Sequence, residues 1–489
     1  MSKTKSNIIY NLTYQVMILL LPMVTAPYLS RVLGVDGIGT YSYVMSVAYY
    51  FYIVILSGLT NYGNRSIAKI KDERDKRTKT FWSIYAMQFL VGVVTTLIYL
   101  FYTFFIAEEQ YRLFFVAFIP YVLSAVIDVN WFFFGLTDFK FTTIRNTTIK
   151  LLCLVMIFVF VKQDDDLMKY FIIMGASFFL SSLLLWTRLR KHVDFYVPNI
   201  KEVIVHIKPN CILFIPILAL SVYRVMDKIM IKEISNVTQN GYYENADKII
   251  TVSLTIFAAV ATVMMPSVSN MIAKGQKDNV KSLLRDSMQM SMFLAVGIMF
   301  GLIAVGRVFA PIFFGKEFYE SGILIQLLSV TVVLSGWKAV LRSQYIIPFE
   351  KDKAYVLSLV AGAAVNLVCN IIFIRLYQAR GAVIGTLAAE IVGFVIQTYV
   401  SSKEINVKNL FKDSVYFIIP GFAMMIVVNL YLNFVKYGII NLCIAIIMGI
   451  VLYCIFSIFV MYLFNRSRIS YLKNRYFNFL NRIGRKKYV

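Results

Sequence analysis

Charged side chains inside long apolar stretches are the residues of this chain whose types and spacing indicate chemistry. One stretch holds Arg224, Asp227 and Lys228, and another holds Lys338 and Arg342. A charge within a membrane helix is costly, so it faces a water-filled cavity or pairs with an opposite charge. Arg224 and Asp227 are three residues apart, share a helical face and are placed to pair.

The acids in these stretches are too few to pair with all the bases. They are Asp128, Asp227 and Glu390. A buried base without an anionic partner costs several kcal/mol, so we predict that at least one base faces water or an anion. The alternative for each base is a structural ion pair, or a side chain near a span end that reaches the membrane surface.

Membrane-spanning helices must position these charges, because the composition excludes an ordinary soluble domain. The chain has 489 residues, 59% of them hydrophobic and 15% charged, with a mean hydropathy of +0.71. Soluble chains are about 45–50% apolar and about 25% charged. The net charge of +23 is scattered among apolar runs, which excludes a nucleic-acid-binding face.

Cysteine and histidine chemistry is also excluded. All five cysteines stand inside apolar runs, which excludes a disulfide framework and a cysteine zinc site. His192 and His206 lie between apolar runs, which argues against intramembrane histidine metal sites and serine–histidine catalysis.

Fourteen apolar runs are long enough for membrane spans. With the N-terminus inside, the inside segments carry 33 Lys and Arg residues and the outside loops carry 9. This bias predicts a multi-pass cell-membrane protein with cytoplasmic N- and C-termini. The longest outside loop is 232–247. The predicted spans are 8–30, 38–60, 82–105, 113–134, 147–161, 170–186, 211–231, 248–267, 288–310, 322–342, 354–374, 381–400, 414–433 and 438–464.

A weak internal repeat indicates a duplicated six-helix unit. Gly39 aligns with Gly241 and Tyr41 with Tyr243, at an offset of 202, and an Ile-Ala-Lys sequence recurs at a similar offset. Both copies begin inside, so they are parallel repeats. The predicted parts are an N-terminal bundle at 1–186, an interfacial linker at 187–210, a C-terminal bundle at 211–400, helices 13 and 14 within 401–464, and a basic cytoplasmic tail at 465–489.

Three segments carry a specific family resemblance. Residues 61–69 read Asn-Tyr-Gly-Asn-Arg-Ser-Ile-Ala-Lys, residues 27–41 contain Pro-Tyr-Leu-Ser-Arg-Val-Leu-Gly and Gly-Ile-Gly-Thr-Tyr, and residues 131–146 contain Trp-Phe-Phe-Phe-Gly-Leu-Thr-Asp-Phe-Lys and Ile-Arg-Asn. The chain resembles the Wzx-type oligosaccharide flippases of the MOP (multidrug/oligosaccharidyl-lipid/polysaccharide) exporters. The resemblance implies an all-α polytopic fold of about fourteen helices, with two six-helix bundles around a central cavity and two extra C-terminal helices.

The resemblance also implies a substrate, and it favours the bases Arg31 and Arg65, because basic residues around the first two spans line the cavity in related flippases. The substrate is an undecaprenyl-diphosphate-linked glycan, moved from the inner to the outer leaflet. Arginine matches a diphosphate with a bidentate fork, and lysine adds a point charge. The predicted substrate-binding residues are Arg31, Arg65, Arg224 and Lys338, with Lys228 and Arg342 in reserve.

In related flippases, oxygen ligands on spans 7, 11 and 12 form a sodium site. Here Asn366 and Asn370 share one helical face, as do Thr386 and Glu390, and Asp227 is on span 7. Oxygen ligands suit a hard cation, so these five residues are the predicted site for Na⁺ as the coupling ion, with H⁺ as the other possibility. Hydrogen bonding between helices is the alternative role for the asparagines. No other metal, no cofactor and no enzymatic activity is predicted.

The sequence also leads to expectations about binding partners and leaves two alternative functions open. The partners are the lipid bilayer, the lipid-linked glycan, and a polymerase and other membrane proteins of glycan assembly; nucleic acid is not expected, and the chain is expected to be a monomer. One rival is a multidrug exporter of the same superfamily, which would favour an acidic cavity. The other is a membrane enzyme of glycan assembly, a polymerase or an acyltransferase, which the absence of a large outer loop disfavours.

Overall fold

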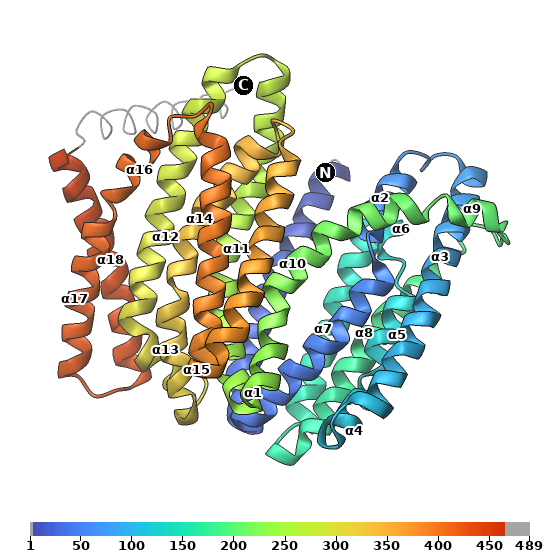
Figure 1. Cartoon of the computed structure of the whole chain (residues 1–489), viewed down its shortest axis with the longest axis horizontal. Coiled ribbons are helices and arrows are strands. Elements are labelled where there is room, and N and C mark those ends of the chain that lie inside the picture. The colour runs from blue at the N-terminus through green and yellow to red at the C-terminus, as the bar shows by residue number, and fades with distance from the viewer. Residues whose placement is uncertain (1–2, 465–489) are drawn as a thin grey trace. The chain divides into compact units, whose positions relative to one another are not determined.

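The computed structural model describes residues 3–464, and every regular element among them is a helix (Figure 1). This confirms the predicted all-α class. The predicted basic tail at 465–489 lies outside the described residues.

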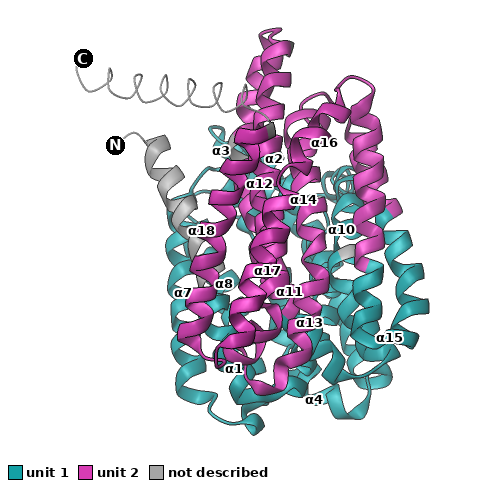
Figure 2. Cartoon of the chain, turned by 90° about the vertical axis from the view of Figure 1, so that its left-hand side faces the viewer, with its two compact units in different colours: residues 1–245, 362–385 teal, residues 246–361, 386–489 magenta. Residues whose placement is uncertain are grey.

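The chain forms two compact units, residues 1–245 with 362–385 and residues 246–361 with 386–489 (Figure 2). The predicted bundles at 1–186 and 211–400 stay a prediction, because a repeat and a compactly packed unit are different properties. The first unit contains α1 (Lys3–Leu56), α2 (Leu59–Ala68), α3 (Arg74–Phe101), η1 (Tyr102–Ile106), α4 (Glu109–Ala117), α5 (Ile119–Val126), α6 (Asn130–Gly135), α7 (Phe139–Phe160), η2 (Asp164–Asp166), α8 (Leu167–Leu189), α9 (Ile200–Ile204), α10 (Ile207–Ile234), the start of α11 (Val237–Ala273) and the middle of α15 (Asp352–Ser402). The second contains the rest of α11 and α15 with α12 (Lys277–Phe313), η3 (Lys316–Phe318), α13 (Tyr319–Leu328), α14 (Val330–Leu341), η4 (Arg342–Ile346), α16 (Val407–Val415), α17 (Ile418–Phe434) and α18 (Ile439–Phe464).

Ten helices of the described part are long and apolar enough to cross a membrane. Two of them are bent at single residues with positive φ, α1 at Gly34 (66°) and α15 at Gln378 (51°), so each supplies two of the predicted spans. The pair 316–328 and 330–346, bent by 42°, supplies another. The chain is therefore a multi-pass membrane protein.

Two sequence expectations about individual segments were wrong. The predicted span 113–134 is three short helices, α4 to α6, because Pro120 lies in the first turn of α5 and the chain turns again before Asn130. The predicted outside loop 232–247 is mostly helical, because α10 continues to Ile234 and α11 begins at Val237. The backbone N–H of Gln239 donates to the Asn236 side chain at 2.9 Å, which favours a helix start at this point.

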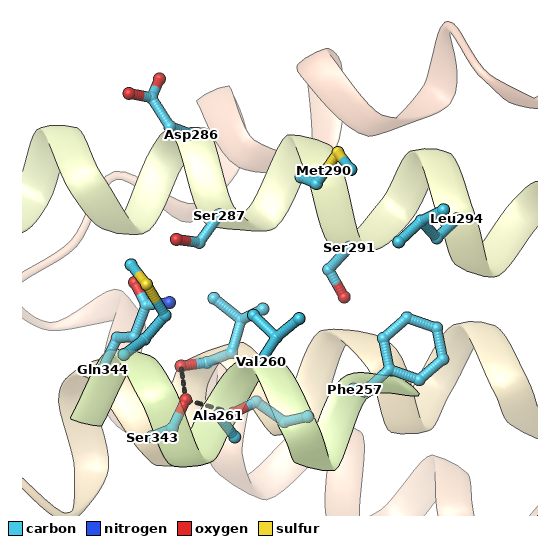
Figure 3. A pocket seen from close by; sticks show the side chains of 13 residues that line it. Phe257, Val260, Ala261, Asp286, Ser287, Met290, Ser291, Leu294, Ser343 and Gln344 are labelled. Atoms are coloured by element: carbon cyan, nitrogen blue, oxygen red, sulfur yellow. Dashed lines mark hydrogen bonds between the residues drawn. The ribbon is translucent and has the colours of Figure 1, made fainter. Parts of the chain in front are cut away.

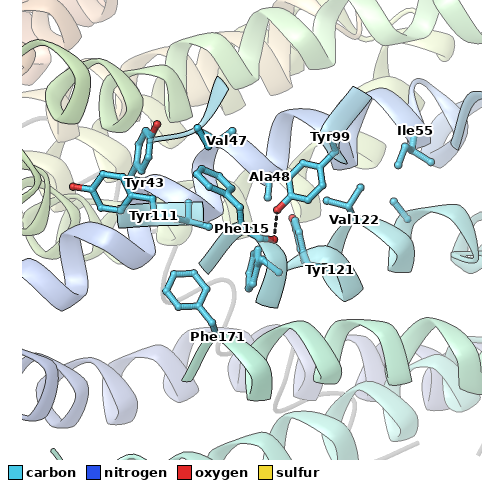
Figure 4. Close-up of a cluster of buried hydrophobic side chains, with 14 of the residues drawn as sticks. Tyr43, Val47, Ala48, Ile55, Tyr99, Tyr111, Phe115, Tyr121, Val122 and Phe171 are labelled. Carbon is cyan, nitrogen blue, oxygen red and sulfur yellow. Dashed lines mark hydrogen bonds between the residues drawn. The ribbon is translucent and has the colours of Figure 1, made fainter. Parts of the chain in front are cut away.

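Aromatic side chains form the core of the first unit. Tyr99, Phe115 and Phe171 are fully buried among α1, α3, α4, α5 and α8 (Figure 4). The Tyr99 hydroxyl donates to the Phe115 carbonyl oxygen at 2.8 Å, which satisfies the polar end of a buried ring. The aromatic content of this unit therefore includes a packed interior as well as membrane-facing rings.

Two of the segments that carry the family resemblance pack against each other as α2 and α6. A Cβ atom at Gly63 would lie 2.5 Å from the Trp131 ring, and one at Gly135 would lie 2.7 Å from the Ile67 Cβ. Each glycine leaves room for a large side chain of the other helix. The two motifs are thus one packing unit at one end of the first bundle.

A close crossing joins the start of α11 to α1. A Cβ atom at Gly39 would lie 2.0 Å from the Val237 carbonyl oxygen and 3.0 Å from the Gly241 backbone nitrogen, and one at Gly241 would lie 2.2 Å from the Val35 carbonyl oxygen. Glycine permits this approach because it has no side chain, as in the small-residue crossings of membrane helices.

Hydrogen bonds at this crossing also join equivalent positions. The Thr238 hydroxyl donates to Asp36 at 2.5 Å, and the Ser42 hydroxyl donates to Glu244 at 2.8 Å; both pairs are 202 residues apart. Two copies of a repeat that are related by a two-fold axis would touch through matching positions in this way. These contacts agree with the predicted alignment of Gly39 with Gly241, and the six-helix repeat stays a prediction.

In the second unit, α12 packs against α13, α14, α16, α17 and α18. A Cβ atom at Gly421 of α17 would lie 2.3 Å from the Phe300 ring, and the Tyr453 ring of α18 lies over Gly297. The Tyr453 hydroxyl donates to the Phe293 carbonyl oxygen at 2.7 Å. The last two spans are thus held directly on α12.

Candidate functional site

Asp227 lies at the centre of a buried polar cluster in the first unit. The Tyr243 hydroxyl donates to its Oδ2 at 2.7 Å, and the Asn370 side-chain amide donates to its Oδ1 at 2.6 Å. The same amide lies 3.3 Å from the Asn366 Oδ1. All four side chains are at most 3% exposed, so the cluster brings α10, α11 and α15 together inside the protein.

Part of the site predicted for a small hard cation lies in this cluster. The Asn370 side-chain oxygen is buried and accepts no hydrogen bond from the described residues, while the amide nitrogen of the same side chain faces the Asp227 carboxylate. Carboxylate and amide oxygens are the ligands that such ions prefer. Three of the five predicted ion ligands, Asp227, Asn366 and Asn370, are thus brought together, whereas Thr386 and Glu390 belong to the second unit.

Lys228 forms an ion pair that the sequence did not indicate. Its Nζ lies 2.7 Å from the Glu244 Oε2, which also accepts the Ser42 hydroxyl. The sequence predicts Glu244 in the outside loop 232–247, and so it is not among the three acids counted inside the apolar stretches. Because the start of α11 is helical, this carboxylate lies against α10 and pairs with Lys228. The excess of bases over acids is therefore one smaller than the sequence predicts.

Arg224 does not pair with Asp227, contrary to the sequence expectation. Asp227 is 1% exposed and points toward Tyr243 and Asn370, whereas Arg224 is exposed and makes no ion pair or hydrogen bond with the residues that the structure describes. Positions three apart on a helix diverge by about 60°, which is enough to separate an inward carboxylate from an outward guanidinium.

Arg31 and Arg65 are exposed and lie on the first unit. Arg31 donates to the Pro27 carbonyl oxygen at 3.4 Å within α1, and Arg65 lies in the last turn of α2. Arg31, Arg65 and Arg224 thus all present charge on the surface of the first unit, and their roles in binding substrate stay predictions.

Lys338 forms an ion pair in the second unit. Its Nζ lies 2.7 Å from the Glu390 Oε2, which also accepts the Ser335 hydroxyl at 2.8 Å. The absence of a side chain at Gly393 makes room for the lysine, because a Cβ atom there would lie 3.3 Å from the Nζ. The geometry supports a structural role for Lys338 and leaves its substrate role a prediction.

Arg342, the other predicted base of this unit, is half-buried at the start of η4. Its Nη1 lies 3.5 Å from the Tyr355 hydroxyl, and its guanidinium lies 5.8 Å from the centre of the same ring. Among the described residues it therefore contacts an aromatic side chain and forms no ion pair with a carboxylate.

A second charged cluster, missed by the sequence reasoning, lies where α10 ends. Lys232 forms ion pairs with Glu108 and with Glu233, the latter at 3.2 Å, and its Nζ lies 4.5 Å from the centre of the Tyr43 ring. The hydrogen bond from Lys232 holds the pKa of Glu108 below its ordinary value. A signal was present in the sequence, since Lys232 and Glu233 end an apolar run.

The long apolar helices, with charges buried inside them, define a multi-pass membrane protein with a polar interior. The family model described as "Polysaccharide biosynthesis protein" matches residues 4–272, more than half of the chain, and the chain belongs to this family. A second model, "Lipid II flippase MurJ", matches residues 213–449.

Similar proteins agree with this assignment. A "Putative O-antigen transporter" of Shigella dysenteriae is 22% identical over 386 residues, which cover 76% of this chain and 93% of that protein. A protein of the same name from Escherichia coli (strain K12) is 27% identical over 164 residues, 33% of this chain, so the chain spans 40% of that relative's length. The solved structure of the lipid II flippase MurJ in an inward closed conformation has the same fold, with a TM-score of 0.69 at 18% identity over 91% of this chain and 99% of that chain. The resemblance to the oligosaccharide flippases of the MOP superfamily is confirmed.

Proposed function

We propose that this protein is a flippase that moves oligosaccharide units linked to undecaprenyl diphosphate from the cytoplasmic to the outer leaflet of the cell membrane. Membership of the polysaccharide biosynthesis family and relatives named as O-antigen transporters support this proposal. Both termini are cytoplasmic, as the distribution of basic residues predicts.

The observation that carries the proposal is the position of Arg224. This residue lies in the interior of α10, about 15 Å from the helix end at Ile234, and its exposed guanidinium has no ion pair among the described residues. An arginine at the centre of a membrane helix costs about 2.5–3.5 kcal/mol when it faces hydrocarbon. A water-filled path that admits an anionic headgroup removes this cost.

The diphosphate is the part of the substrate that a path lined by basic side chains would bind. Moving it through about 30 Å of hydrocarbon is prohibitive unless polar groups replace its hydration. Arg31, Arg65 and Arg224 supply exposed guanidinium groups, which suit phosphate oxygens. Lys228, Lys338 and Arg342 are secondary candidates for the same contact. Lys228 and Lys338 would bind the diphosphate only after it displaces Glu244 and Glu390 from their ion pairs.

In this proposal an ion gradient supplies the energy for transport. Na⁺ is the ion that the residue types around Asp227 favour. Asp227, Asn366 and Asn370 would hold the ion in the first unit, and Thr386 and Glu390 stay ligands predicted from the sequence alone. The support is the buried side-chain oxygen of Asn370, which has no hydrogen-bond partner among the described residues, on a side chain that contacts the Asp227 carboxylate.

Replacing Arg224 in the purified full chain tests this mechanism in vesicles. We expect Arg224→Ala to lower the transport of a lipid-diphosphate-linked oligosaccharide by about tenfold or more, the effect of losing one charge-assisted contact. Arg224→Lys should retain part of the activity, because it keeps the charge and loses the fork. Arg375→Ala, which changes an exposed arginine of α15 in the same unit, is the matched control. Wild-type transport by Arg224→Ala would contradict the mechanism.

A further inference from the structure

A pocket in the second unit is lined by a polar side chain that has no hydrogen-bond partner among the described residues. The pocket has a volume of about 260 Å³ and is lined by α11, α12, α14 and η4 (Figure 3). All of its lining residues lie in the second unit. A water molecule occupies about 30 Å³ of liquid, so the pocket has room for a group far larger than a single water.

Gln344 is the polar group. Its side chain is 0% exposed, yet neither its amide nitrogen nor its amide oxygen has a hydrogen-bond partner among the described residues. A buried polar group without a partner is costly, so native structures satisfy it with a ligand, an ion or water. Gln344 lies in the π-helix η4, a type of turn that is frequent at functional sites.

The walls of the pocket limit what can satisfy this amide. Phe257, Val260 and Leu294 contribute apolar surface, and Ser287 and Ser291 on α12 add hydroxyls (Figure 3). None of the described lining residues is Lys or Arg, so the pocket does not suit a phosphate. An acyl chain would match the apolar walls and leave both amide atoms unpaired.

A sugar ring meets both requirements. One hydroxyl donates to the amide oxygen while its neighbour accepts from the amide nitrogen, so a primary amide can engage two adjacent hydroxyls at once. The C–H faces of the ring are apolar and pack on an aromatic side chain such as Phe257. A site built to hydrogen-bond a hydroxyl discriminates strongly against groups that lack one.

We propose that this pocket binds one sugar ring of the lipid-linked glycan, with Gln344 as the residue that recognises its hydroxyls; the identity of the sugar as substrate rests on the proposed flippase function. The pocket lies near the predicted cytoplasmic ends of spans 8, 9 and 10, the side from which a lipid-linked glycan would enter. Because no described lining residue is a base, the pocket takes the glycan and not the diphosphate in this proposal.

The variant Gln344→Leu tests the pocket, because leucine has a similar size and no polar atom. If the amide were merely structural, removing an unpaired buried group would leave binding unchanged and stability equal or higher. Gln397→Leu is the matched control, since Gln397 is also a buried glutamine of the second unit with an unpaired side-chain oxygen, and it does not line the pocket.

The first measurement is equilibrium binding of radiolabelled methyl glycosides of glucose, galactose, mannose and N-acetylglucosamine to the purified full chain. We expect at least one glycoside to bind, with its affinity lowered about tenfold by Gln344→Leu and unchanged by Gln397→Leu. If no glycoside binds, or if binding is the same in all three proteins, the amide is satisfied by water only and the proposal is wrong.

The second measurement separates this proposal from the flippase function. Vesicles with each protein are supplied with undecaprenyl diphosphate, bare or carrying an oligosaccharide. We expect the wild-type protein to prefer the glycosylated lipid and Gln344→Leu to lose that preference. If glycoside binding depends on Gln344 and neither lipid is moved, the pocket stands and the flippase function fails. If the lipids are moved with an unchanged preference in Gln344→Leu, the function stands and the sugar pocket fails.

Discussion

Gly39 and Gly241 lie against each other where α1 and α11 cross, at matching positions of the internal repeat, with 3.0 Å between the place of a Gly39 Cβ and the Gly241 backbone nitrogen. The contact joins two helices that come from opposite halves of the sequence. It forms within the first unit, so the beginning of α11 is anchored to α1.

A methyl group at this crossing should destabilise the protein. Gly39→Ala would meet the Val237 backbone at 2.0 Å, so the helices must separate, at a cost of about 1–3 kcal/mol. Gly301→Ala is the control, because nothing lies within 4 Å of a Cβ at that helical position, and there alanine favours the helix. Thermal unfolding in detergent should show a lower midpoint for Gly39→Ala alone. Equal midpoints for the two variants would rule out the close crossing.

Replacing Asp227 should uncouple transport from sodium while the protein stays folded. Asparagine keeps the shape of the side chain; its oxygen can still accept from Asn370, and its NH2 can donate to the Tyr243 hydroxyl oxygen in place of the present bond. It removes the charge that a cation requires. Transport by Asp227→Asn is measured with and without a sodium gradient, and we expect the two rates to be equal. Asp128→Asn is the control, since Asp128 is a buried aspartate of the same unit, bonded to Asn130; it should retain the dependence. Indifference of the wild-type protein to both sodium and proton gradients would exclude the ion site.

Variants of the Lys338–Glu390 pair can distinguish a structural role of Lys338 from a role of Lys338 in transport. Lys338→Met leaves a carboxylate only 4% exposed without its partner, which costs about 3–5 kcal/mol for a buried pair. Adding Glu390→Gln removes the stranded charge, so the double variant should regain most of the thermal stability. If Lys338 also contacts substrate, as we predict, the double variant is stable and transports more slowly than Glu390→Gln alone, the comparison that allows for the predicted role of Glu390 in ion binding. Wild-type transport by a stable double variant would show that this lysine is structural only.

Helix positions were predictable from the sequence, whereas charge partners were not. Hydropathy alone located the runs, and the spacing of Asn366 and Asn370 correctly placed both on one face. The pairing of Lys228 with Glu244 depends on how far α10 and α11 extend. Polar residues at the ends of membrane helices look like loop residues by hydropathy, so this carboxylate was assigned to a loop.

Local spacing also fails when tertiary contacts compete with it. Arg224 and Asp227 have the right separation for a pair within one helix, yet Tyr243 and Asn370 supply better-placed partners for the carboxylate. Neither partner is near Asp227 in sequence. The sequence also could not predict that the Gln344 amide lacks a hydrogen-bond partner. Burial and hydrogen bonding of one glutamine depend on how the helices pack.

Movement of a lipid-diphosphate-linked oligosaccharide between leaflets is the most direct test of the proposed function. The purified full chain is placed in vesicles that carry this lipid with a labelled glycan, and a membrane-impermeant glycosidase removes the label from the outer leaflet. A non-flipping chain leaves the label of the inner leaflet protected. We predict that the wild-type protein exposes the protected label to the enzyme much faster than protein-free vesicles do, in vesicles that remain sealed. Protected label that persists equally with and without the protein, under sodium and proton gradients of either direction, would contradict the flippase function.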